Sequence, residues 1–264
     1  MNFRPRIERI GSSVLDGVDA SLDLWRVLTA TLFGVFRGRR PKGEVVHQMY
    51  QVGNRSLLFV GVTLGFIGMV MIYQTCLQVN RITGDLSQVG GEFAKILVHD
   101  FGPTLTAMML ATRVGAGIAA EIGSMKVTEQ IDALRMTGVA PIEYLIVPRF
   151  LACLSMTLVL AVFGACIAYA AGGLTAYASF GVNPRVFFNP SKIEYVDLIL
   201  GVTKCVAYGM AIPIISGFCG LRARGSSEGV GWATTAAVIG SSFAVILLDV
   251  IISAMGFLFQ TGGM

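Results

Sequence analysis

Four ionisable side chains, His99, Asp100, Lys204 and Asp249, stand inside long apolar stretches, where charges are rare. Because an ionisable group in a membrane span costs about 2.5–3.5 kcal/mol on insertion scales, it generally pairs with another group or lines a wet cavity. Lys204 and Asp249 have opposite signs and similar depths in their stretches. We therefore predict an intramembrane ion pair between them, with a structural role.

The run His99-Asp100-Phe101-Gly102-Pro103 combines charge with two residues that loosen a helix. Glycine and proline free backbone groups in a span, which is tolerated where the helix lines a cavity. We expect His99 and Asp100 to line an outward-opening cavity and to contact or gate a ligand there. A cap on a broken helix is the structural alternative.

The whole chain has the composition of a membrane protein. Of its 264 residues, 54% are hydrophobic and 14% charged, whereas soluble domains carry about 25% charged residues. The net charge of +4 is modest and the basic residues cluster at the ends of apolar runs, which argues against a nucleic-acid partner. The five cysteines form no CxxC pair and indicate small core residues, with no metal site.

Five apolar segments can cross a bilayer, which requires roughly 20 apolar residues each. The sequence predicts an all-α integral membrane protein with a single domain over 1–264, and the spans are 57–79, 93–120, 146–180, 196–221 and 231–259. Fifteen of the twenty Lys and Arg residues fall on one side of these spans and four on the other. By the positive-inside rule, the N-terminus is predicted to be cytoplasmic and the C-terminus periplasmic.

The segment 1–55 is predicted to begin with an amphipathic helix. Its apolar positions recur every three or four residues, at Ile7, Ile10, Val14, Val18, Leu22, Trp25, Leu28 and Leu32. Such a helix lies in the membrane interface, and a soluble helix docked on a partner is the alternative. A basic elbow suited to lipid headgroups follows at Arg37, Arg39, Arg40 and Lys42.

The segment 121–138, between the second and third spans, is too polar for lipid. We expect a short helix that Ser124 caps and that Gly138 and Pro141 end. Clamped between two spans, it is suited to act as a lever for a cytoplasmic machine, although a solvated loop helix is the simpler alternative. The residues assigned to the lever are Glu121, Lys126, Thr128, Glu129, Gln130, Asp132 and Leu134.

The run from Arg113 to Leu134, RVGAGIAAEIGSMKVTEQIDAL, followed by Pro148-Arg149-Phe150, resembles the MlaE/YrbE family of permeases. The resemblance implies a homodimer in the bacterial inner membrane that moves phospholipid between the inner and outer membranes. It also implies as partners a cytoplasmic ABC ATPase dimer that uses ATP and Mg²⁺, a periplasmic ring of MCE-domain protein and a small cytoplasmic STAS-type subunit. The helix at 129–134 would then be the coupling helix that docks on the ATPase.

A phospholipid substrate would need apolar walls for its tails. The first span offers Phe66, Met69, Val70, Tyr73 and Leu77 at helical spacing, although such a stripe is also typical of simple packing. With His99 and Asp100 these residues make up the predicted lipid cavity. The family commonly has Arg-Glu where this chain has His99-Asp100.

The sequence lacks the motifs of other mechanisms. It has no G-x-x-x-x-G-K-[ST] phosphate loop, so we expect no cofactor and no ATP hydrolysis in this chain. The glycines from Gly115 to Ala120 match a dinucleotide pattern but lack the strand that the pattern requires. A membrane enzyme would need a catalytic motif that is absent. A proton-coupled secondary transporter using Asp100, Lys204 and Asp249 is the alternative, but no inverted repeat supports it.

Overall fold

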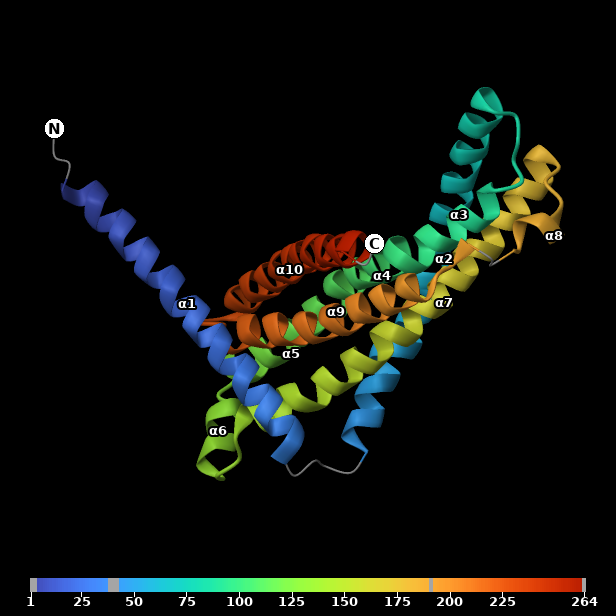
Figure 1. Ribbon diagram of the computed structural model, residues 1–264. Coiled ribbons are helices and arrows are strands. Elements are labelled where there is room, and N and C mark those ends of the chain that lie inside the picture. The colour runs from blue at the N-terminus through green and yellow to red at the C-terminus, as the bar shows by residue number, and fades with distance from the viewer. Residues whose placement is uncertain (1–3, 38–42, 190–191, 263–264) are drawn as a thin grey trace.

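The structure is a computed structural model that describes residues 4–37, 43–189 and 192–262 (Figure 1). The helices are α1 (Arg4–Arg37), α2 (Glu44–Ile82), α3 (Val89–Ile96), η1 (Leu97–Phe101), α4 (Gly102–Leu110), η2 (Ala111–Gly115), α5 (Ala116–Val127), α6 (Gln130–Met136), η3 (Ile142–Ile146), α7 (Val147–Phe180), α8 (Pro184–Phe187), α9 (Tyr195–Leu221) and α10 (Ser227–Gly262). The η segments are π-helical turns, which are wider than α-helical ones. These ranges contain no strand, so the predicted all-α class is confirmed for the described part of the chain.

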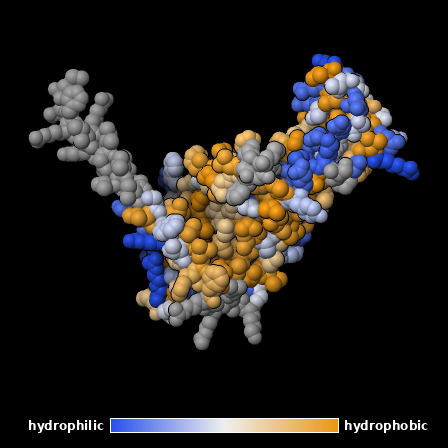
Figure 2. Space-filling model, in the orientation of Figure 1, coloured by the Kyte–Doolittle hydropathy of each residue, from blue (hydrophilic) through white to orange (hydrophobic). Residues whose placement is uncertain are grey.

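Five helical units are long and apolar enough to cross a membrane, as predicted. They are α2, the run Val89–Val127, the run Ile142–Phe180, α9, and α10 through Leu258. Large hydrophobic side chains stay exposed on them, for example Leu58 at 80% and Leu174 at 65%. Figure 2 shows hydrophobic side chains over the middle of the molecule and hydrophilic ones gathered around α3 and α8. The chain is therefore a multi-pass membrane protein whose outer surface contacts lipid.

The second span contains two π-helical segments, η1 and η2. Pro103 follows η1 closely, within the first turn of α4. Proline lacks an N–H, and its ring would clash with the carbonyl four residues earlier in a regular α-helix. A wider turn avoids this conflict, and π-bulges are a known cause of helix distortion. The loosening expected at Gly102 and Pro103 thus takes the form of a π-helical turn in a continuous helix.

The first and third spans, α2 and α7, pack along each other. A Cβ at Gly68 would lie 2.5 Å from the carbonyl oxygen of Ala168, so only glycine permits this approach. Gly61 and Gly65 face Ile167 across the same contact. Small residues at helical spacing therefore let the two backbones meet closely.

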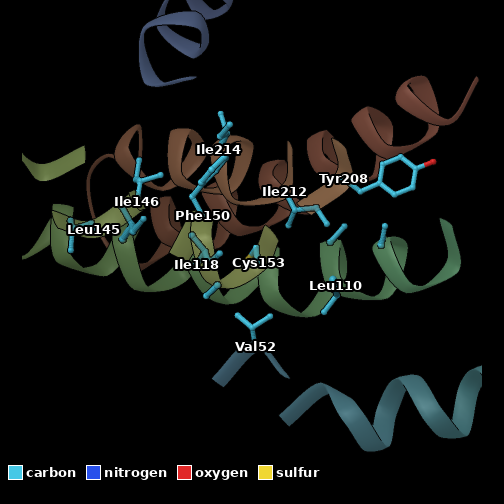
Figure 3. Packing of buried hydrophobic residues seen from close by; sticks show 14 of the residues in the cluster. Val52, Leu110, Ile118, Leu145, Ile146, Phe150, Cys153, Tyr208, Ile212 and Ile214 are labelled. Atoms are coloured by element: carbon cyan, nitrogen blue, oxygen red, sulfur yellow. The ribbon is translucent and has the colours of Figure 1, made fainter. Parts of the chain in front are cut away.

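Two clusters of buried hydrophobic side chains hold the bundle. One joins α1, α2 and α4 to α7, α9 and α10 and also includes Ile131 of α6 (Figure 3). Tyr208 lies at one edge of it, and its hydroxyl points away from Ile212 and Leu110. The second cluster is built around Leu64 and Ile72 of α2, with side chains from α3, α7 and α8.

The N-terminal helix α1 leaves much of the predicted apolar face exposed. Val27 is buried against the rest of the protein, whereas Trp25 is 64% and Phe33 58% exposed. Trp25 and Leu22 of the predicted apolar face therefore point outward, where lipid can cover them, whereas Leu28 of that face packs partly against the core. Of the predicted elbow, Arg39, Arg40 and Lys42 lie outside the described residues, and Arg37 is the last residue of α1.

The polar segment 121–138 is divided differently from the prediction of one helix beginning at Ser124. Helix α5 runs through Ser124 to Val127, so Ser124 is no cap, and its carbonyl accepts the N–H of Thr128. Glu129 then takes a left-handed conformation, with φ 61°, and α6 begins at Gln130. Such a φ is unfavourable for a residue with a Cβ, and a sequence pattern points to it only at glycine or asparagine.

Candidate functional site

A charged centre lies where η1, α9 and α10 meet. Lys204 of α9 is fully buried, and its Nζ lies 2.9 Å from Oδ1 of Asp249 in α10. The same Nζ donates a hydrogen bond to Oδ1 of Asp100 in η1. The other carboxylate oxygen of Asp100 lies 2.8 Å from Nδ1 of His99. The structure thus joins the four ionisable residues that the sequence analysis singled out in one network, in which Lys204 has two acidic partners.

Two further side chains belong to the charged centre, and the sequence analysis missed both. Tyr208 Oη donates a hydrogen bond of 2.7 Å to Oδ1 of Asp249, and Thr104 Oγ1 donates one of 3.2 Å to the same atom. Each lies about one turn after a charged residue, Lys204 or Asp100, and hence near the same helical face. That spacing is the signal that could have found them. With these two donors and the ammonium group of Lys204, the carboxylate of Asp249 is well compensated.

Gly201 positions the π-helical segment η1 against α9. A Cβ at this residue would lie 2.4 Å from the carbonyl oxygen of Val98 in η1. Asp100 is two residues after Val98, and Lys204 is almost one turn after Gly201. The close approach at Gly201 therefore brings the carboxylate within reach of the ammonium group.

The predicted apolar stripe on α2 lies on a different surface from the charged centre. Phe66 is 63%, Val70 55% and Tyr73 45% exposed. Phe66 and Met69 line a groove of about 660 Å³ between α2 and α7, whereas Leu77 lines a separate pocket nearer the end of α2. Neither hollow includes His99 or Asp100. In this single chain the structure does not bring the stripe and the His99–Asp100 pair into one cavity.

Helix α6 and the turn before it project at one end of the bundle (Figure 1). Ile131 is fully buried and Leu134 packs partly against the core, whereas Thr128, Glu129 and Gln130 are exposed. The polar surface is therefore held by an apolar anchor.

Asp132 organises the charges of this surface. Lys126 Nζ lies 2.9 Å from Oδ2 and Arg135 Nη1 lies 3.1 Å from Oδ1 of the same carboxylate. The hydrogen bond from Lys126 holds the pKa of Asp132 below its ordinary value. The carboxylate is thus charged at neutral pH and links α5 to α6.

Glu121, also assigned to the lever, lies apart from the α6 surface. Its Oε1 is 2.8 Å from Nη2 of Arg149 in α7, whose side chain is only 5% exposed. Both residues line a polar pocket between α2, α5 and α7. The structure gives Glu121 an internal partner and separates it from the exposed residues of α6.

The donor set of the charged centre is that of an ion-pair network. Within the described ranges, no group of three or more His, Cys, Asp or Glu side chains is arranged to hold a metal ion. The described cysteines are free thiols, and Cys76, Cys153 and Cys205 are buried. The charged centre can therefore balance charges within the bundle, and the apolar surfaces can contact an apolar ligand.

The comparisons with known proteins agree on one family. The sequence profile of the family described as Permease MlaE matches residues 45–255. A probable ABC transporter permease protein of Synechocystis is 34% identical over 247 residues, which cover 90% of this chain and 94% of the relative. The intermembrane phospholipid transport system permease protein MlaE of Haemophilus influenzae is 32% identical over 255 residues, or 95% and 97% of the two chains.

A plant protein is also similar. Protein TRIGALACTOSYLDIACYLGLYCEROL 1, chloroplastic, of Arabidopsis thaliana is 29% identical over 249 residues, which cover 91% of this chain and 70% of the relative. The region that the family profile matches includes both the charged centre and α6. The similarity therefore extends over the two parts of the molecule whose geometry is described above.

Proposed function

Since this chain belongs to the MlaE permease family and is thus an ABC transporter permease, we propose that it moves phospholipid between the inner and outer membranes of a bacterium. The relative from Haemophilus influenzae is named for intermembrane phospholipid transport, which supports this substrate. In the proposal, a homodimer in the inner membrane works with a separate cytoplasmic ATPase dimer, which binds the ATP and Mg²⁺. A periplasmic MCE-domain ring and a small STAS-type subunit complete the assembly.

The orientation of the chain is part of this proposal. The Lys and Arg residues concentrate on the side of the bundle that carries α6, which supports a cytoplasmic α6 and N-terminus and a periplasmic C-terminus. The outward-pointing Trp25 and Phe33 support an interfacial position for α1. An ATPase on the cytoplasmic side would then meet the exposed surface of α6.

The observation that carries the proposal is the direct connection between α6 and the charged centre. Helix α5, which Lys126 and Asp132 tie to α6, continues through η2 and α4 to η1, where Asp100 bonds to Lys204. A displacement of α6 by an ATPase would be transmitted along this one span to α9 and α10. The groove on α2 and α7 offers an apolar surface for lipid tails.

A charge reversal on α6 tests the coupling. Asp132→Lys places three cations together, because Lys126 and Arg135 both bond to Asp132. In proteoliposomes containing the ATPase and the MCE-domain protein, we expect ATP-dependent phospholipid transfer to fall at least tenfold while the protein stays folded. The matched control is Asp85→Lys, since Asp85 is an exposed aspartate in the loop between α2 and α3.

A second variant tests the side chain of Glu129 without straining the backbone at this position. Glu129→Gly removes the side chain but suits the left-handed conformation at this position. If the carboxylate of Glu129 contacts the ATPase, this variant also loses coupling, without strain at the turn. Normal transfer with Asp132→Lys, or ATP hydrolysis by the purified chain alone, would overturn the proposed function.

A further inference from the structure

A polar pocket at the α6 end of the bundle contains three arginines that the charged centre and the lever do not use. The pocket has a volume of about 230 Å³, and Arg55 of α2, Arg113 of η2 and Arg149 of α7 line it together with Glu121. The three cations come from three different spans and are opposed by a single carboxylate. We call this site the arginine pocket.

The positive charge of the arginine pocket is only partly balanced. Glu121 bonds to Arg149, and Arg113 donates a hydrogen bond to the hydroxyl of Ser56. Neither Arg55 nor Arg113 forms an ion pair with any residue in the part of the chain that the structure describes. Arg55 also lies close enough to Arg113 for their like charges to repel. Two guanidinium groups therefore remain without a counter-charge.

Arg149 adds a buried donor without a partner at the wall of the pocket. Nε of Arg149 has no hydrogen-bond partner, although the side chain is only 5% exposed. Its Nη1 donates to the carbonyl of Leu145 at 3.2 Å and its Nη2 faces Glu121. An unsatisfied buried donor is costly, so the guanidinium group of Arg149 is held beside the pocket with incomplete compensation.

The chemistry and depth of the pocket favour a phosphate group of a lipid. Guanidinium groups match the oxygens of a phosphate with paired hydrogen bonds. All three arginines lie in the half of their span that is nearer α6, on the side of the leaflet that α6 faces. The volume is below the roughly 300–1,000 Å³ of pockets that enclose whole drug-sized ligands, so the pocket suits a headgroup while the tails stay outside.

We propose that the arginine pocket binds the phosphate group of a phospholipid in the leaflet that faces α6. Phosphate binding itself does not depend on transport. The assignment to the inner leaflet, and a role as the first site that a transported lipid occupies, rest on the proposed function.

Binding can be measured by native mass spectrometry of the full chain released from detergent. The pocket variant Arg55→Gln/Arg113→Gln removes the two unpaired cations, and the matched control Arg81→Gln/Arg185→Gln removes two exposed arginines near the opposite end. Arg149 is left intact, because its loss would leave Glu121 unpaired. The probes are dioleoylphosphatidylglycerol, dioleoylglycerol, which lacks the phosphate, and inorganic phosphate.

We expect the pocket variant to lose one equivalent of bound phosphatidylglycerol, with at least a tenfold loss of affinity for it, and the control variant to change less than twofold. Dioleoylglycerol should not occupy this site. Equal phosphatidylglycerol binding by the two double variants would overturn the proposal. Binding of inorganic phosphate without binding of phosphatidylglycerol would overturn the lipid assignment and leave an anion site.

Two further measurements distinguish lipid binding from transport and from the binding of a partner protein. A chain carrying Asp132→Lys, in which the proposed coupling is lost, should still bind phosphatidylglycerol at this site, so failure of transport and failure of binding are distinguishable. If the chain binds no phosphatidylglycerol here but the pocket variant releases the ATPase during copurification, the arginines serve an acidic partner protein and the proposal is wrong.

Discussion

The charged centre and the arginine pocket both place cations inside an apolar helix bundle, but the two regions balance those charges differently. In the charged centre, Lys204 has two carboxylates as partners, and Asp249 accepts two hydrogen bonds in addition to its ion pair. In the arginine pocket, three guanidinium groups face one carboxylate, Glu121, which pairs with Arg149. The comparison teaches that the chain itself balances the charges of the first region, whereas it leaves Arg55 and Arg113 of the second without a counter-charge among the described residues, which is the basis of the proposed phosphate site.

The largest expected effect is on the charged centre. Lys204→Met would leave the carboxylates of Asp100 and Asp249 without their common cation, which costs at most about 3–5 kcal/mol, the value for a fully buried pair, because these carboxylates are partly exposed. We expect a large fall in the yield of folded protein and in the midpoint of unfolding in detergent. The measurement is size-exclusion chromatography combined with thermal unfolding.

A neutralised control sharpens this test. Adding Asp100→Asn and Asp249→Asn to Lys204→Met removes the unpaired charges and should restore most of the stability. The sequence analysis paired Lys204 with Asp249 alone, and a charge exchange would restore such an isolated pair. With Asp100 in the network, Lys204→Asp/Asp249→Lys should restore less, because it sets two aspartates together. If Lys204→Met were as stable as the unchanged protein, the charged centre would contribute nothing to the free energy of unfolding.

A smaller effect is expected where η1 approaches α9. Gly201→Ala places a methyl group 2.4 Å from the carbonyl oxygen of Val98, and such overpacking costs about 1–3 kcal/mol. The change should also weaken the Asp100–Lys204 contact. Gly231→Ala is the control, because a Cβ there meets nothing within 4 Å. Unfolding in detergent compares the two, and equal stability would contradict the close approach.

Tyr208→Phe removes one of the two hydroxyl donors to Asp249 and leaves the ring in the core. Loss of a single hydrogen bond typically costs about 1 kcal/mol, so the midpoint of unfolding should fall less than for Lys204→Met. Combining Tyr208→Phe with Asp249→Asn measures the coupling between them. Additive effects would argue that the hydroxyl and the carboxylate do not interact.

The smallest effect on stability is expected in the arginine pocket. Arg55 is exposed and forms no ion pair with the residues that the structure describes, so Arg55→Gln should change the free energy of unfolding by less than about 0.5 kcal/mol. Phosphatidylglycerol binding by the same variant should nevertheless weaken. A loss of stability as large as that of Tyr208→Phe would remove the contrast between the two regions.

Much of the fold follows from properties that are local in the chain. The lengths and hydropathy of the apolar runs predict five spans, because a bilayer requires about 20 apolar residues per crossing. The proline at 103 predicts an irregular helix, since it cannot donate the next backbone bond. The polar run before Gly138 predicts a surface segment between spans, because it is too polar to lie in lipid.

What the tertiary structure decided is which of these groups meet. Asp100 joins Lys204 because Gly201 lets two backbones approach, and Glu129 rather than a glycine takes the left-handed turn before α6. Arg55, Arg113 and Arg149 come from three spans and converge only after those spans pack. Sequence periodicity places a residue on a face of its own helix, whereas contacts between faces depend on interhelical distances of a few ångströms, which no single segment encodes.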